Sequence, residues 1–150
     1  MTTGNAKRTR HLVAVWNPAL AENALDASVQ MLLEAVRDFR DKKREEEDVY
    51  VWWGKVRSSN RQQPLPHLTD ILALDDKLDV DHGPECEMHL YLTNYRALYV
   101  AHVGEITAEN VLDTEPESVP AFYAAAKLNC DCWFQLRDIR FLVLAGVEER

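Results

Sequence analysis

Apolar residues recur along this chain in short runs separated by polar segments, a pattern typical of a sheet-rich domain. Six runs are rich in β-branched or aromatic residues and predict strands. They cover residues 11–16, 49–56, 86–92, 97–106, 132–136 and 140–147. Residues 93–96 have turn chemistry and predict a hairpin between the third and fourth runs. The last two runs are joined through Arg137 and Asp138.

Helical spacing is sustained in only one long stretch. Asn17 and Pro18 break the first apolar run, and Pro18 is expected to open a helix that continues to about Lys43. Its apolar positions are Leu20, Ala24, Ala27, Met31, Ala35 and Phe39. Residues 68–78 and 121–128 predict short helical inserts, and the charged run at residues 40–48 predicts a solvated helix end.

This order of elements predicts an α+β domain. We expect a small curved mixed sheet or a β-barrel, with one long N-terminal helix and short helical inserts. Strands and helices do not alternate regularly, which argues against a Rossmann-like fold. Residues 1–10 are expected to form a flexible basic tail, and residues 11–150 a single domain.

The charge is distributed unevenly along the sequence. The chain has 17 Lys and Arg against 25 Asp and Glu, a formal net charge of −8. Residues 1–75 are balanced, so the whole excess of acid lies in residues 76–150. Strong non-specific binding to a phosphate backbone needs clustered cations, and this charge argues against it. The net charge is compatible with recognition of one base in one pocket that has a modest basic rim.

The composition also indicates where the protein works. The polar start of the chain lacks the apolar segment of a secretory signal, and no apolar stretch is long enough for a membrane helix. Three cysteines do not form a disulfide framework. We therefore expect a cytoplasmic protein without membrane association.

Motifs for catalysis or cofactor binding are lacking. The chain has no glycine-rich phosphate loop and no nucleophile elbow, so we expect no cofactor and, on balance, no enzyme. The residues with metal-binding chemistry have spacings unlike those of structural zinc sites, and no metal is expected. They are His82, Cys86, His89, Cys130 and Cys132. The cysteines beside Trp133 are expected to be packed thiols.

Aromatic and polar residues adjoin at the ends of the first two predicted strands. Trp52 and Trp53 must face opposite sides of a strand, so we expect Trp52 in the core and Trp53 at a pocket. Indole, carboxamide and guanidinium groups together suit a planar ligand such as a nucleobase. The candidate residues are Trp16, Asn17, Trp53, Arg57, Asn60 and Arg61. The alternative is two core tryptophans beside a solvated loop.

Three segments of the chain resemble the PUA-like superfamily, most of all its EVE-type members, which are related to YTH and ASCH domains. They are residues 13–18 (Val-Ala-Val-Trp-Asn-Pro), residues 53–61 (Trp-Gly-Lys-Val-Arg-Ser-Ser-Asn-Arg), and the hairpin of residues 90–106. Lys55 lies inside the second motif, and the family's usual Gly-Asp turn before the central strand is absent.

The resemblance implies a small barrel that accepts a modified or flipped base of nucleic acid in an aromatic pocket. Such domains often serve prokaryotic defence or restriction systems. In this scheme Trp16 and Trp53 stack on the base, Asn17 and Asn94 bind its edge, and Arg57 holds phosphate. Arg61 is expected to hold phosphate together with Arg57.

Two other functions stay open from the sequence. The acidic second half could bind a basic protein partner, which would make the chain an interaction or sensor module. His102 with a carboxylate could also serve a nuclease or nucleotide hydrolase, since His11, His102, Glu105 and Asp138 lie on or near predicted strands.

Overall fold

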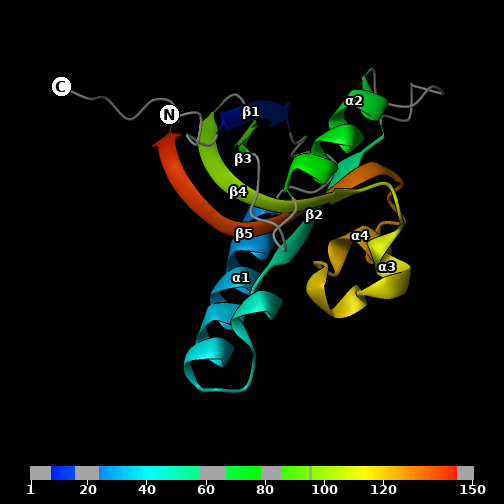
Figure 1. Ribbon diagram of the computed structural model, residues 1–150. Helices are drawn as coiled ribbons and strands as arrows, with labels where there is room; N and C mark the ends of the chain where they lie inside the picture. Colours follow the sequence, from blue (N-terminus) through cyan, green and yellow to red (C-terminus); the bar gives the residue numbers. More distant parts are fainter. Residues whose placement is uncertain (1–7, 16–23, 58–66, 79–85, 95, 145–150) are drawn as a thin grey trace, which may run out of the picture.

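A five-stranded mixed sheet forms the frame of the computed structural model, which describes residues 8–15, 24–57, 67–78, 86–94 and 96–144 (Figure 1). The strands are β1 (Arg8–Val15), β2 (Val51–Val56), β3 (Cys86–Thr93), β4 (Ala97–Thr107) and β5 (Cys130–Leu144). Their order in the sheet is β1-β3-β4-β5-β2. β1 runs parallel to β3, and the other neighbours are antiparallel. Among the described strands, β1 and β2 form the two edges, so this sheet is open and the barrel alternative does not hold for it.

Short helices accompany the sheet, and the predicted α+β class is confirmed. The α-helices are α1 (Ala24–Arg40), α2 (Leu68–Ala73), α3 (Val111–Thr114) and α4 (Phe122–Ala125). Short 3-10 turns are η1 (Glu46–Asp48), η2 (Leu74–Leu78) and η3 (Pro116–Ser118). No helix in the described part of the chain has the length and apolar content needed to cross a bilayer.

The sheet is strongly curved, as β4 and β5 show by following one arc (Figure 1). Their pairing shifts register at three places, between Leu98 and Tyr99, between His102 and Val103, and between Val103 and Glu105. Extra residues in one strand of a pair bend it and increase its twist. The irregular register therefore accounts for the arc.

Two boundaries differ from the prediction. β5 is one strand of 15 residues, whereas two runs were expected. It continues through the charged break because Asp138 remains paired with His102 of β4, and the Arg137 guanidinium donates to Gln135 and to the carbonyl of Glu47. β1 begins at Arg8, inside the expected tail, because Arg8 pairs with the first residue of β3.

Two apolar cores lie on opposite faces of the sheet. The first packs α1, α2 and η2 against one face, and among its buried residues are Leu32, Trp53, Leu78, Met88, Leu90, Val103, Phe134 and Leu136. The second lies under α3, η3 and α4, and it contains Trp52, Val111, Val119, Tyr123 and Trp133. The end of the sheet formed by β2 and the first half of β5 is thus covered on both faces.

Gly54 in β2 lies at the tightest point of the second core. It is opposite Trp133 in the register, and a Cβ at this position would lie 2.5 Å from the Cys130 Sγ and 2.8 Å from the Trp133 ring. The Gly54 N–H donates to the Tyr123 hydroxyl at 2.9 Å, and the same hydroxyl donates to the Gly54 carbonyl at 3.3 Å. Only a residue without a side chain permits this approach.

We therefore expect Gly54→Ala to lower the free energy of unfolding by about 1–3 kcal/mol, the usual cost of overpacking a core. Urea denaturation followed by tryptophan fluorescence measures it. Gly104→Ala is the comparison outside the second core, because its Cβ would meet Gln135 Oε1 at 2.6 Å and Arg137 Nε at 3.0 Å, so two long side chains must shift there but no ring does. Equal losses for the two variants would contradict the packing argument.

Candidate functional site

The two neighbouring tryptophans of β2 are both buried. They face opposite sides of the strand, as expected, but Trp52 is 0% exposed in the second core and Trp53 is 2% exposed in the first. The Trp53 ring packs beside Phe134, with 6.1 Å between ring centroids. The expectation that Trp53 faces a pocket therefore does not fit its position, since no face of its indole is open for a base to stack on.

Arg57 is held by a buried carboxylate. Its Nε donates to Asp131 Oδ1 at 2.6 Å, and the Asp131 side chain is 0% exposed while that of Arg57 is 37% exposed. A buried carboxylate needs such a partner, because an unpaired charge away from water is costly. This ion pair gives Arg57 a structural role, and the expected phosphate contact stays a prediction.

Of the other expected base-binding residues, Asn94 lies in the described part of the chain. The Asn94 side chain is used locally, because its Oδ1 accepts hydrogen bonds from the backbone N–H groups of Arg96 and Ala97, both at 2.9 Å. It caps the turn between β3 and β4, as Asn commonly does in turns. Trp16, Asn17, Asn60 and Arg61 lie outside the described residues.

Replacing Arg57 should therefore affect stability. We expect Arg57→Met to lower the free energy of unfolding by about 1–3 kcal/mol, less than the full cost of breaking a buried pair because Arg57 is partly solvated and Asp131 has a further interaction. Adding Asp131→Asn should recover part of the loss in urea denaturation. Arg140→Met is the control, since its ion pair with Asp138 is exposed and its loss should cost well under about 1 kcal/mol. Equal effects at the two sites would show that burial of Asp131 is irrelevant.

The most distinctive surface in the described part of the chain is a row of histidines across the sheet. His11 of β1 pairs with His89 of β3, and His89 pairs with His102 of β4. Ring centroids are 5.4 Å apart for His11 and His89, and 6.2 Å apart for His89 and His102. Tyr91 joins them from β3, with its ring centroid 5.7 Å from that of His11. We name these four residues the aromatic platform.

An open groove of about 490 Å³ runs along this face. His89, Tyr91 and His102 line it, together with Glu87 at one end and the Asp138–Arg140 pair at the other. Arg140 Nε donates to Asp138 Oδ2 at 2.9 Å, and both side chains are largely exposed. The groove therefore combines flat rings with a few charged groups at its ends.

The sequence predicts only part of this set. His11, His102 and Asp138 lie on or near predicted strands as candidate chemical groups, and the register places His102 opposite Asp138. His89 belongs to a set whose spacing does not predict a zinc site, and no motif singles out Tyr91 or Arg140. Period-two alternation with the buried Met88, Leu90 and Leu92 was the available signal that His89 and Tyr91 share the other face.

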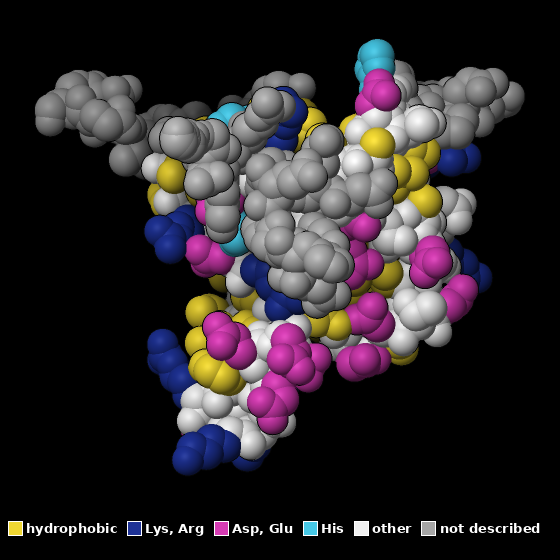
Figure 2. Space-filling model, viewed as in Figure 1, with side chains coloured by type: hydrophobic (Ala, Val, Ile, Leu, Met, Phe, Trp, Pro, Cys, Tyr) yellow, Lys and Arg dark blue, Asp and Glu magenta, His cyan; other side chains and the backbone are white. Residues whose placement is uncertain are grey.

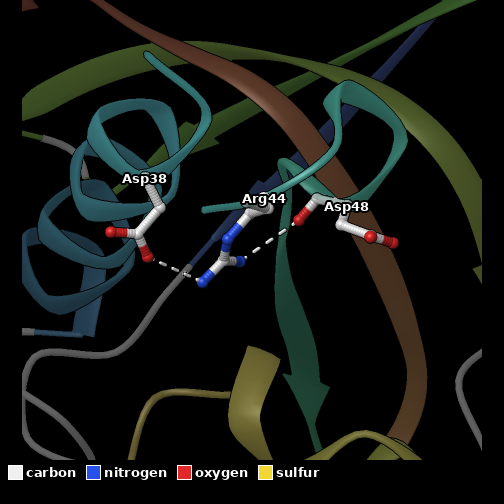
Figure 3. Close-up of polar contacts among 3 residues, drawn as sticks. All are labelled: Asp38, Arg44 and Asp48. Carbon is white, nitrogen blue, oxygen red and sulfur yellow. Dashed lines mark hydrogen bonds and ion pairs between the residues drawn. The ribbon is translucent and has the colours of Figure 1, made fainter. Parts of the chain in front are cut away.

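A second groove, of about 460 Å³, lies between the end of α1 and η3. Its wall includes Arg44, which bridges Asp38 of α1 and the backbone carbonyl of Asp48, each at 3.2 Å (Figure 3). Tyr50 also lines it, and its hydroxyl donates to Glu115. Burial and the Glu115 carboxylate raise the pKa of Tyr50 to about 12. These contacts are explained by local structure, since Arg44 joins α1 to η1 and Tyr50 joins the start of β2 to the segment after β4.

Acidic side chains gather around the segment that follows β4. Figure 2 shows Asp and Glu side chains in the area where Figure 1 draws α3 and α4. Glu109, Asp113 and Glu117 are exposed there. Partial burial, followed by the carboxylates of Asp75 and Glu115, raises the pKa of Glu105 above its usual value. The ionised form of Glu105 is therefore disfavoured in the folded protein.

A raised pKa means that the folded protein holds the Glu105 proton more tightly than the unfolded chain does, so stability falls as the pH rises through the raised value. We expect Glu105→Gln to increase the free energy of unfolding at pH 7. The gain should shrink as the pH falls toward the usual pKa of Glu, where the carboxyl group becomes protonated in both states. Urea denaturation at several pH values measures this. Asp113→Asn serves as an exposed control, and a gain that grew on acidification would contradict the argument.

The cysteines behave as the sequence predicted for packed thiols. Cys132 is buried, and Cys130 packs against the second core. Burial raises the pKa of the Cys130 thiol to about 12 and that of Cys132 to about 11. Both therefore stay protonated and unreactive at neutral pH. Within the described residues, no three ligating side chains already surround a point where a metal ion could sit.

Comparisons of the chain with models of known protein families, with curated protein sequences and with solved structures find no match. The class of the protein is therefore described from its fold and surface. It is an α+β domain with an open mixed sheet, and one face of that sheet carries a row of histidines.

Proposed function

We propose that this protein is a non-catalytic recognition module that binds an unpaired, flipped or modified base of nucleic acid on the aromatic platform. The observation that carries the proposal is the alignment of His11, His89 and His102 in one row across three neighbouring strands, with Tyr91 beside it. The proposal therefore assigns base binding to the sheet face and not to Trp53.

Single rings of the platform support stacking. Bases stack on exposed aromatic side chains. His11 is exposed, and neighbouring ring planes are inclined by 64°, 40° and 79°, so a base would stack on one ring and meet the edges of the others. Imidazole nitrogens and the Tyr91 hydroxyl add hydrogen-bonding groups for a base edge.

The charges near the groove favour binding of a single base over binding of a long nucleic-acid strand. Arg140 is the described cation that lines the groove, and Asp138 already pairs with it. A net charge of −8 opposes extended contact with phosphates. Binding would therefore depend on ring contacts, with a weak contribution from phosphate.

Titration of labelled oligonucleotides by fluorescence anisotropy tests the proposal. Single strands and duplexes of one sequence should be compared, each with and without a methylated base. We expect the protein to bind an unpaired base, and Tyr91→Ala or His89→Ala to weaken binding at least about fivefold, because stacking contributes about 1–3 kcal/mol per base.

Phe39→Ala is the matched control, since Phe39 is an exposed ring on α1, which packs on the other face of the sheet. The Phe39→Ala variant should bind the oligonucleotide with the same affinity as the unmodified protein. Absence of binding to every oligonucleotide, or an equal loss in Phe39→Ala, would refute recognition on the platform. Circular dichroism of each variant verifies that the fold is intact.

The acidic surface after β4 supports a second candidate, a protein-interaction module with a basic partner. The observation that favours it is the group of exposed carboxylates of Glu109, Asp113 and Glu117 near Glu105, whose own pKa is raised by burial and then by the Asp75 and Glu115 carboxylates. A lysine-rich peptide should then bind in a salt-sensitive manner and lose affinity in Glu105→Gln. Peptide binding without oligonucleotide binding would favour this function over the first.

A further inference from the structure

One corner of the aromatic platform has the composition of a metal site. Glu87 and His89 lie two residues apart on β3, so both side chains project from the same face. Glu87 Oε2 is 3.8 Å from His89 Nε2. His11 lies directly opposite His89 on β1, with 5.4 Å between the ring centroids. Two imidazoles and one carboxylate thus adjoin at the edge of the sheet.

These separations are close to those that one ion requires. Zinc binds imidazole nitrogen and carboxylate oxygen at about 2.0–2.2 Å, so two rings on one ion have their centroids roughly 5 Å apart and an N and O pair about 3 Å apart. The observed 5.4 Å and 3.8 Å exceed these values by less than about 1 Å.

The side chains have the freedom to close this gap. His11 is exposed, and the side chains of His89 and Glu87 are 32% and 42% exposed. Exposed side chains change rotamer rapidly, whereas the strands fix their Cβ positions. No three ligands among the described residues surround one point as they stand, so the three side chains must change rotamer to bind one ion.

The opposite end of the histidine row is less suitable. The His89 and His102 centroids are 6.2 Å apart, farther than those of His89 and His11. The carboxylate beside His102, that of Asp138, accepts a hydrogen bond from Arg140 at 2.9 Å, and the guanidinium would repel a cation. The corner at β1 and β3 therefore offers the better set of ligands.

We propose that His11, Glu87 and His89 bind a divalent ion of the zinc class. Water completes the coordination, because three protein ligands leave an open position. The proposal does not depend on nucleic-acid binding, since the ion alone is the ligand. It adds a metal site to a surface for which the sequence predicts none.

Titration of the chelator-treated full chain with zinc chloride by calorimetry tests the site. We expect one ion per chain, with His89→Asn and His11→Asn each lowering the affinity at least about tenfold, since a lost imidazole ligand costs no less than a lost outer-shell partner. Glu87→Gln should lower it to a smaller extent. His67→Asn is the matched control: His67 also lies near a carboxylate, 3.6 Å from Asp70, but at the N-cap of α2 and far from the row in sequence.

Cobalt substitution gives an independent readout. Cobalt bound at this site should show visible ligand-field bands without the intense near-ultraviolet bands of thiolate ligands, and it should broaden the ring resonances of His11 and His89 in NMR spectra. Thiolate bands, or an affinity unchanged in His89→Asn, would overturn the proposal. A loss in His102→Asn without one in His11→Asn would overturn the assignment of His11. The resonance test uses the unmodified chain, so it remains decisive even if a variant fails to fold.

Discussion

Burial of β2 on both of its faces is the constraint on which the rest of the structure depends. Trp52 and Trp53 are neighbours, so they project to opposite sides and each needs its own core. α1 and α2 contribute to one core, and the segment from α3 to α4 covers the other. Because Gly54 has no side chain, the Trp133 ring packs directly against the β2 backbone. The Tyr123 hydroxyl accepts a hydrogen bond from the Gly54 N–H and so fixes the segment from α3 to α4 to β2.

This arrangement divides the sheet into two functional parts. The end at β2 and the first half of β5 is sandwiched between two cores, and its polar groups, such as Asp131, are satisfied internally. At the other end, β1, β3 and β4 bury only one face, through residues such as Met88 and Leu90. Their other face carries imidazole, phenol and charged groups along an open groove. The surface available for binding is therefore the part that the second core does not reach.

The local pattern of apolar and polar residues predicted the strands and helices well. It did not predict which residues far apart in the sequence lie side by side. Alternating apolar runs identified all five strands, because burial of one face imposes a period of two on the sequence. The burial of both tryptophans was missed, since the covering segment after β4 is mostly polar and its apolar contacts, Val111, Val119 and Tyr123, are scattered. The histidine row was missed for a different reason. His11 and His89 become neighbours only through a parallel pairing between distant segments, and no local signal specifies that register.

The acidity of the chain and the character of the platform are consistent with one another. The excess of acid lies in residues 76–150, with exposed carboxylates after β4, and it disfavours any ligand held mainly through phosphate. The groove contains few charges, and its described cation is paired with Asp138. The proposed function assigns discrimination on this surface to ring shape, stacking and imidazole nitrogens. The same charge distribution opposes non-specific binding to nucleic acid, so the proposed ligands are a single exposed base and a single ion.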